Sequence, residues 1–271
     1  MTEKHAIGRV RHELRRRLLT VTASERLTPN MLRITLTGDD LSGFISAGYD
    51  DHIKICIPEN GKDPIWSASL PGAAPLSEGV VASSLRDFTP RRYDPVANEL
   101  VIDFAVHEAG PATAWAVSAV PGTRLGIGGP RGSFVVADDF DWYVLIGDET
   151  ALPAIGRRLE ELRSGAKVFV IATVTSEDEQ QSFTSRADLD IRWLHRPLSQ
   201  ASQAAPVLAA AAALALPDGD GYVWIAGETD IAKALRQHFV TERGIQKNWV
   251  KAAGYWRHGS VGFHENHDDR E

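Results

Sequence analysis

The chain changes its residue pattern near Asp138, and this change constrains the fold more than any other feature of the sequence. Before it, short β-type runs at 31–37, 52–57, 100–106 and 124–127 are separated by Gly, Pro and Asp. Residues 112–119 predict one helix between two of these runs. Short strands broken by turn residues are typical of an antiparallel barrel. We therefore expect a β-barrel domain over residues 1–137.

After Asp138, predicted strands alternate with predicted helices. The strands are expected at 142–147, 167–174, 191–194 and 221–226, and the helices at 151–164, 200–216 and 229–243. This alternation predicts a parallel, doubly wound α/β sheet. Ligands of such sheets lie at the carboxyl ends of the strands. The second domain is therefore expected over residues 138–271.

Composition excludes several classes of protein. The formal net charge of −7 argues against a nucleic-acid partner, so an anionic ligand needs a local cluster of cations. Cys56, in an apolar run, is the only cysteine. An intrachain disulfide and a Cys-based metal cluster are therefore excluded, and we interpret Cys56 as a small buried hydrophobe.

No segment of the sequence predicts a signal peptide or a membrane span. Residues 1–20 are basic but lack an apolar core, and the alanine-rich run 204–216 is too short to cross a bilayer. His258, His264 and His267 lack the His-Glu-x-x-His spacing, so no metal site is predicted. We expect a monomeric cytoplasmic protein.

The run from Arg86 to Arg91 combines a cation, an aromatic ring and a small hydroxyl. A guanidinium suits a phosphate, Phe88 suits a flat redox ring, and Thr89 places a hydroxyl near that ring. A plain strand with a surface arginine and a core phenylalanine is the alternative. This run predicts one half of a flavin-nucleotide site.

The second half is predicted where Gly110-Pro111 starts a helix. Proline is tolerated in a first helical turn, and free N–H groups at a helix start bind anions. Small residues there leave room for a pyrophosphate. The alternatives are that Thr113 is only a helix cap and Trp115 only a core residue.

Two further motifs fall at strand ends. Gly128-Gly129-Pro130-Arg131-Gly132 is either a tight turn or a turn that projects Arg131 toward a cofactor. Asp148, Thr150 and Ala151 follow the first strand of the second domain, where a dinucleotide is expected to meet the sheet. They are either helix-start residues or cofactor contacts. Gly227-Glu228-Thr229 repeats this layout after a later strand.

The five motifs together resemble the siderophore-interacting protein family. Their order is Arg-x-aromatic-Thr-x-Arg, His-x-x-Gly-Pro-Ala-x-x-Trp-Ala, Gly-Pro-Arg-Gly, Gly-Asp-Glu-Thr-Ala-Leu-Pro-Ala and a terminal Gly-Tyr-Trp-Arg-x-Gly. The resemblance covers about residues 21–262. It implies a ferredoxin reductase-like fold, FAD on the barrel, NADH or NADPH on the second domain, and reduction of a ferric siderophore.

The resemblance also implies roles for individual residues. Those that match the flavin motif and the pyrophosphate segment are Arg86, Phe88, Thr89, Arg91, His107, Ala112, Thr113, Trp115 and Ala116. The family usually has tyrosine where this chain has Phe88, so the phenol hydrogen bond is lost while ring stacking is retained. Lys54, Arg131 and Arg257 lie in segments that match family motifs and are the candidates for a basic chelate pocket.

Several alternatives stay open at this point. The acceptor could differ from a ferric chelate, or the protein could carry a siderophore without turnover. The acidic run 176–179 would repel a ribose 2′-phosphate and so favours NADH, but Arg192, Arg196 or Arg257 could hold that phosphate. A ferredoxin is a further candidate donor.

Overall fold

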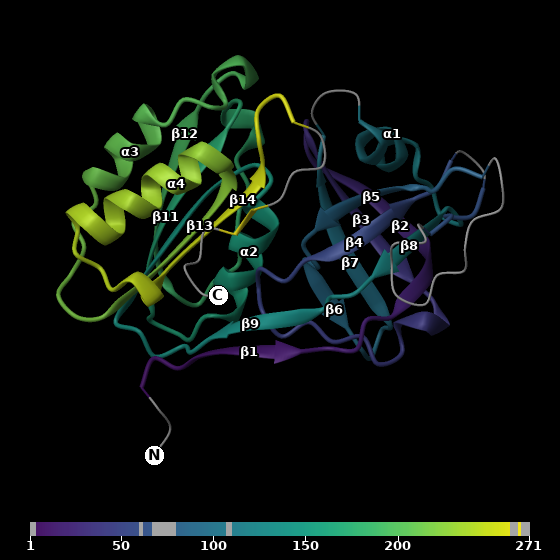
Figure 1. Ribbon diagram of the computed structural model, residues 1–271, viewed down its shortest axis with the longest axis horizontal. Helices are drawn as coiled ribbons and strands as arrows, with labels where there is room; N and C mark the ends of the chain where they lie inside the picture. Colours follow the sequence, from purple (N-terminus) through teal and green to yellow (C-terminus); the bar gives the residue numbers. More distant parts are fainter. Residues whose placement is uncertain (1–3, 60–61, 67–79, 107–109, 261–264, 267–271) are drawn as a thin grey trace. The chain divides into compact units, whose positions relative to one another are not determined.

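The structure is a computed structural model, and it describes residues 4–59, 62–66, 80–106, 110–260 and 265–266. The chain forms two compact units (Figure 1). One is Ile7–Val136, and the other joins the segment that ends at Ala6 to Ala137–Glu271. Each unit has its own sheet and its own buried core.

The first unit is built on a seven-stranded antiparallel sheet in the order β5-β4-β8-β2-β3-β7-β6. Its strands are β2 (Arg16–Thr28), β3 (Met31–Thr37), β4 (Ile53–Ile57), β5 (Ser84–Phe88), β6 (Arg92–Asp94), β7 (Glu99–Ala105) and β8 (Arg124–Gly128). A separate two-stranded sheet pairs β1 (Ile7–Arg11) with β9 (Gly132–Val136). A short 3-10 helix at Asp39–Leu41 and the helix α1 (Pro111–Ser118) are the helical elements described in this unit.

The connection between β5 and β6 forces this sheet to curl. These are its two edge strands, yet only Thr89, Pro90 and Arg91 separate them in sequence. The outer strands of a flat seven-stranded sheet would lie about 29 Å apart. Four peptide links span at most about 14 Å. The two edges must therefore approach each other, which gives the predicted barrel.

The inside of the barrel is filled by alternating apolar side chains. The fully buried ones include Leu19, Ile34, Ile53, Ile102 and Ile127, one from each of five strands. α1 contributes Trp115 and Ala116 to the same core. The helix thus packs on the barrel rather than standing apart from it.

The second unit contains a five-stranded parallel sheet in the order β12-β11-β10-β13-β14, to which β15 (Glu265–Asn266) adds antiparallel. The parallel strands are β10 (Trp142–Asp148), β11 (Lys167–Val174), β12 (Asp188–His195), β13 (Gly221–Glu228) and β14 (Val250–Trp256). The strand order reverses between β10 and β13. Their carboxyl ends form the switch point where such sheets bind ligands.

Helices cover both faces of this sheet (Figure 1). α3 (Ala205–Ala212) and α4 (Thr229–Gln237) pack on the face that carries Val144 and Ile146. α2 (Leu152–Glu161) covers the other face. Gly147 lies on that face, and a Cβ there would overlap Ala151 at the start of α2. The sheet is therefore doubly wound. Together with the barrel, this confirms the predicted fold class.

The structure corrects the lengths of two predicted elements. The alanine-rich helix is shorter than 200–216, because Pro206 sits in its first turn and the chain leaves the helix after Ala212. The predicted helix 229–243 ends as α4 at Gln237 and continues as a π-helical turn, His238–Glu242. β2 was not predicted, because its outer half is polar and exposed.

His5 joins the start of the chain to the second unit. Its ring nitrogens lie 3.0 Å from Asp139 and 3.1 Å from Asp220, and its ring stacks on Phe140 at 4.2 Å.

The described part of the chain contains no helix that is both long and apolar enough to cross a membrane.

Cys56 provides a test of the barrel core. The side chain is fully buried, and burial raises the pKa of its thiol to about 11. The nucleophilic thiolate is therefore scarce at neutral pH. We expect no reaction with a thiol-specific chromogenic disulfide at pH 8 until denaturant unfolds the unit, when one thiol per chain reacts. Rapid reaction in the folded protein would contradict this packing.

Candidate functional site

The predicted flavin motif lies on the edge strand β5, and its side chains alternate between the two faces. Phe88 is in register with Ile53, and Arg86 with Ile55, so both share the core-facing side of the sheet. Asp87 is in register with Lys54 on the opposite side. The aromatic ring and its neighbouring cation therefore face the same way.

An aromatic row connects this motif to α1. Phe88 lies 4.5 Å from Phe104 between ring centroids, and Phe104 lies 5.6 Å from Trp115. Trp115 is 5% exposed, and its indole N–H meets no acceptor among the described residues. The structure thus brings together two motifs that are far apart in sequence.

The remaining residues of the two motifs have different surroundings. The Arg86 guanidinium donates to the Leu85 carbonyl, and the described residues offer it no carboxylate. Thr89 and Arg91 are buried where the barrel edges meet, and Arg91 lies 3.7 Å from Asp103. Asp103 also accepts two hydrogen bonds from Arg33, both at 2.7 Å.

The start of α1 carries no side-chain cap, because Gly110 occupies the N-cap position. Ala112 and Thr113 in its first turn are half-buried, whereas Ala116 is buried in the barrel core. His107 lies outside the described residues, as do His264 and His267.

A basic pocket lies on the other face of the barrel sheet. One row of registered residues crosses four neighbouring strands: Asp87, Lys54, Gly128 and Arg16. Gly128 has no side chain, and the Trp66 ring lies 3.4 Å from the position that its Cβ would take. Lys54, Arg16 and Arg131 all line this pocket. The structure therefore brings two of the three predicted chelate-binding residues together.

Arg16 was missed by sequence reasoning. It stands in the run Arg15-Arg16-Arg17, and nothing in the sequence says which arginine is in register with Gly128. Its guanidinium lies 5.5 Å from the centre of the Trp66 ring, an arrangement in which cation and ring attract each other. Arg257 belongs to the other unit, where it lies 3.6 Å from Asp230.

At the switch point of the second unit, Asp148 connects three strands. One carboxylate oxygen accepts hydrogen bonds from the amide and hydroxyl of Thr150, at 3.0 and 2.6 Å. The other accepts from the Glu228 amide at 3.1 Å and from the Trp256 indole at 2.7 Å. Asp148 and Thr150 are thus engaged with each other, and Ala151 is fully buried.

Glu228 plays a similar part at the start of α4. Its carboxylate accepts from the amides of Asp230 and Ile231, at 2.8 and 3.2 Å, as an N-cap side chain does. The helix start that follows β13 is therefore filled by the protein's own carboxylate. The similar layout after β10 also lies at a strand-to-helix turn, but there the N-cap residue of the helix α2 is Ala151, without a side-chain cap.

A buried ion pair lies next to Asp148. Arg196 contacts both carboxylate oxygens of Glu149, at 2.9 and 3.3 Å. Burial and the nearby Asp148 carboxylate raise the pKa of Glu149 to about 7, although Arg196 acts in the opposite direction. Arg192 is likewise paired, 4.0 Å from Asp190.

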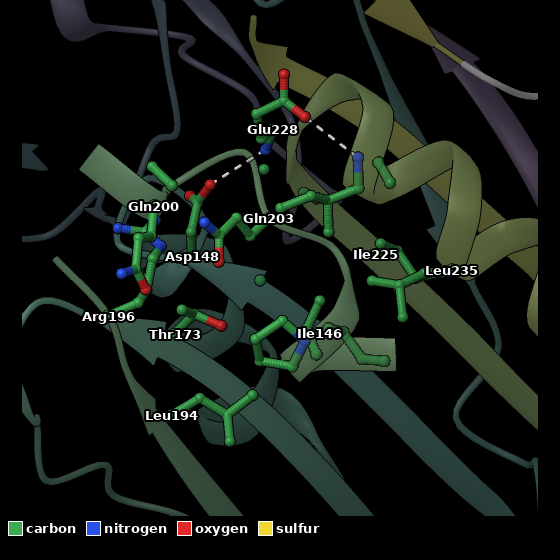
Figure 2. A pocket seen from close by; sticks show the side chains of 18 of the residues that line it. Ile146, Asp148, Thr173, Leu194, Arg196, Gln200, Gln203, Ile225, Glu228 and Leu235 are labelled. Atoms are coloured by element: carbon green, nitrogen blue, oxygen red, sulfur yellow. Dashed lines mark hydrogen bonds between the residues drawn. The ribbon is translucent and has the colours of Figure 1, made fainter. Parts of the chain in front are cut away.

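Asp148, Arg196 and Glu228 border a pocket at the carboxyl ends of the strands (Figure 2). Its floor is apolar and includes Ile146, Leu194 and Ile225. Its rim is polar and includes Arg196, Gln200, Gln203 and Glu228. An apolar floor with a few polar groups at the rim is typical of a small-molecule site. The site suits a flat, uncharged ring better than a phosphate, because Asp148 and Glu228 line it and its lining arginine, Arg196, is paired with Glu149.

Comparison with known proteins identifies the class and then the family. The chain has the fold of the ferredoxin reductases: a ferredoxin–NADP+ reductase from Plasmodium falciparum matches with a TM-score of 0.60 over 84% of this chain and 92% of that chain, at 10% identity. The profile described as siderophore-interacting FAD-binding domain matches residues 20–134, and that described as siderophore-interacting protein matches residues 140–259. The chain belongs to the siderophore-interacting protein family, which confirms the resemblance seen in the sequence.

Two relatives are similar over nearly the whole chain. An NADPH-dependent ferric-chelate reductase of Escherichia coli is 38% identical over 92% of this chain and 95% of its own. The crystal structure of a siderophore utilization protein from T. fusca matches with a TM-score of 0.84 at 35% identity. That match covers 95% of this chain and 98% of that chain.

The four hydrogen bonds of Asp148 lead to a stability prediction. Asp148→Ala leaves the Glu228 amide and the Trp256 indole without their buried acceptor, and each lost partner costs about 1–3 kcal/mol. We expect the free energy of unfolding to fall by about 3 kcal/mol, measured by urea denaturation. Asp178→Ala, at an exposed position, is the matched control and should change it by less than about 0.5 kcal/mol. Equal stabilities of the two variants would contradict the role of Asp148.

Proposed function

We propose that this protein is an FAD-dependent ferric-siderophore reductase that passes electrons from NADH or NADPH to an Fe(III) chelate and releases Fe(II). One observation carries the proposal. The predicted flavin residues Arg86 and Phe88 lie on the same two paired strands as the basic pocket that contains Lys54. The similarity to a ferric-chelate reductase supports it.

The residues of the barrel unit fit a flavin nucleotide. Phe88 is half-buried against Phe104, so it can contribute a ring face. The buried indole N–H of Trp115 has no hydrogen-bond acceptor among the described residues, and Arg86 has no carboxylate partner among them. The uncapped start of α1 supplies backbone N–H groups for a pyrophosphate. We assign FAD to this unit.

Flavin, when bound, accepts two electrons as a hydride and gives them up singly, so it matches a nucleotide donor to Fe(III). One NAD(P)H thus reduces two ferric chelates and leaves NAD(P)+ and one proton. Lys54, Arg16 and Arg131 attract the negatively charged chelate and hold it beside β5. None of these residues needs to act as a general acid or base. Because chelators with hard oxygen donors bind Fe(II) more weakly, reduction releases the metal.

We assign the nucleotide donor to the pocket at the switch point of the second unit. Arg192, Arg196 and Arg257, the cations considered for a 2′-phosphate, each face an aspartate or glutamate. This charge distribution favours NADH, whereas the named relative from Escherichia coli uses NADPH. The proposal includes a monomeric protein acting in the cytoplasm, and a ferredoxin is the alternative donor.

The function is tested by anaerobic stopped-flow absorbance on FAD-loaded protein. NADH or NADPH is mixed first and a ferric siderophore second. We expect one nucleotide to bleach the flavin band and the chelate to restore it. Bleaching without recovery would contradict a ferric chelate as acceptor. An unchanged band with both nucleotides would point to a ferredoxin donor or to a carrier without turnover.

Arg86 is tested through flavin retention. Arg86→Ala removes a guanidinium that the proposal places on a phosphate, and a charge-assisted hydrogen bond contributes about 1.5–3 kcal/mol. We expect FAD to bind at least about tenfold more weakly, measured by the flavin-to-protein absorbance ratio after gel filtration. Arg92→Ala, an exposed neighbour on β6, is the matched control. Equal flavin retention in the two variants would contradict the assignment.

A further inference from the structure

The row of residues across the barrel sheet ends in a carboxylate. β5, β4, β8 and β2 are adjacent (Figure 1), and their registered residues are Asp87, Lys54, Gly128 and Arg16. Registered residues of antiparallel strands point to the same face of the sheet. An acidic side chain therefore stands beside a pocket whose lining includes the cations Arg16, Lys54 and Arg131.

Asp87 is paired with one of these cations. Its Oδ2 lies 2.6 Å from Nζ of Lys54. The Lys54 side chain is 40% exposed and that of Asp87 only 19% exposed. Lys54 is thus accessible to a ligand from solvent, and the less exposed Asp87 forms an ion pair with its ammonium group.

The second oxygen of Asp87 shows that packing does not explain this residue. Oδ1 is buried and accepts no hydrogen bond within the described part of the chain. A buried carboxylate oxygen without a donor lowers the stability of the fold. Stabilisation of the fold does not account for this oxygen, so we attribute the role of Asp87 to the negative charge that it places beside the pocket.

We propose that Asp87 is a specificity-determining residue that sets which ferric chelates this protein accepts, by lowering the positive charge of the pocket. This inference rests on the proposed function. Arg16, Lys54 and Arg131 supply three positive charges, and Asp87 reduces the total to two. The pocket therefore discriminates against chelates of high negative charge relative to neutral ones.

The expected size of the effect follows from Coulomb's law. One unit charge acting on a trianion about 8 Å away in screened water changes the dissociation constant about threefold. On a neutral chelate the same charge has almost no effect. The ratio of the two dissociation constants is therefore the quantity to measure, because a general change in packing would move both alike.

The experiment compares wild-type protein with Asp87→Asn, both loaded with FAD. The probes are the Ga(III) complexes of a tris-catecholamide, with a charge of −3, and of a trihydroxamate, with a charge of zero. Ga(III) has the charge of Fe(III) but is not reduced, so binding is measured without turnover. Tryptophan fluorescence quenching gives each dissociation constant, and flavin absorbance confirms equal FAD content.

We expect Asp87→Asn to tighten binding of the trianionic complex about threefold and to change that of the neutral complex little. Asp87→Glu keeps the charge and should retain wild-type selectivity. Glu25→Gln removes an exposed charge nine residues along β2 from Arg16 and should leave both constants within twofold.

Two outcomes would overturn the inference, and they differ from failure of the proposed function. Unchanged constants, or equal shifts for both complexes, would show that Asp87 does not select by charge, while chelate binding by the wild type would still stand. A wild-type protein that binds neither complex would overturn the proposed function and this inference together.

Discussion

The barrel unit depends on the short connection from Phe88 to Arg92. It ties the two edges of a seven-stranded sheet together, so the sheet has to close on itself. Within this connection, Thr89 and Arg91 are buried, and the Asp103 carboxylate lies close to the Arg91 guanidinium and balances its charge. Arg86 and Phe88, the proposed flavin residues, precede this connection directly. Closure of the barrel therefore fixes the position of the predicted flavin motif.

The alternation of side chains along β5 then divides the chemistry between two faces. Phe88 and Arg86 point to the core side, where Phe104 and Trp115 extend the aromatic row. Asp87, between them in sequence, points to the basic pocket beside Lys54. In the proposed function, one edge strand thus serves both a redox ring and its anionic acceptor. A shift of one residue in the β4–β5 register would exchange the two faces and destroy both sites.

Local patterns predicted much of this fold, and non-local pairing limited the rest. Residues 31–37 and 167–174 alternate or run apolar between clear breaks, and both strands are found with those bounds. β2 is half polar, and its strand character comes from pairing with β3 and β8, which no local pattern encodes. For the same reason Lys54 and Arg131 could be grouped through motif resemblance, whereas Arg16 could not. The hydrogen-bond partners of Asp148 on β13 and β14 could not be predicted from the sequence either, because they depend on the order of the strands in the sheet.

The raised pKa of Glu149 links folding to the uptake of a proton. The unfolded carboxyl titrates near 4.5 and the folded one near 7, because burial and Asp148 disfavour its charge. Between these two values the native chain holds one proton more at this position than the unfolded chain does. Its contribution to stability therefore falls as pH rises through that window, and stays constant outside it. The contribution of Glu149 to stability, next to the proposed nucleotide pocket, is thus largest on the acidic side of neutrality.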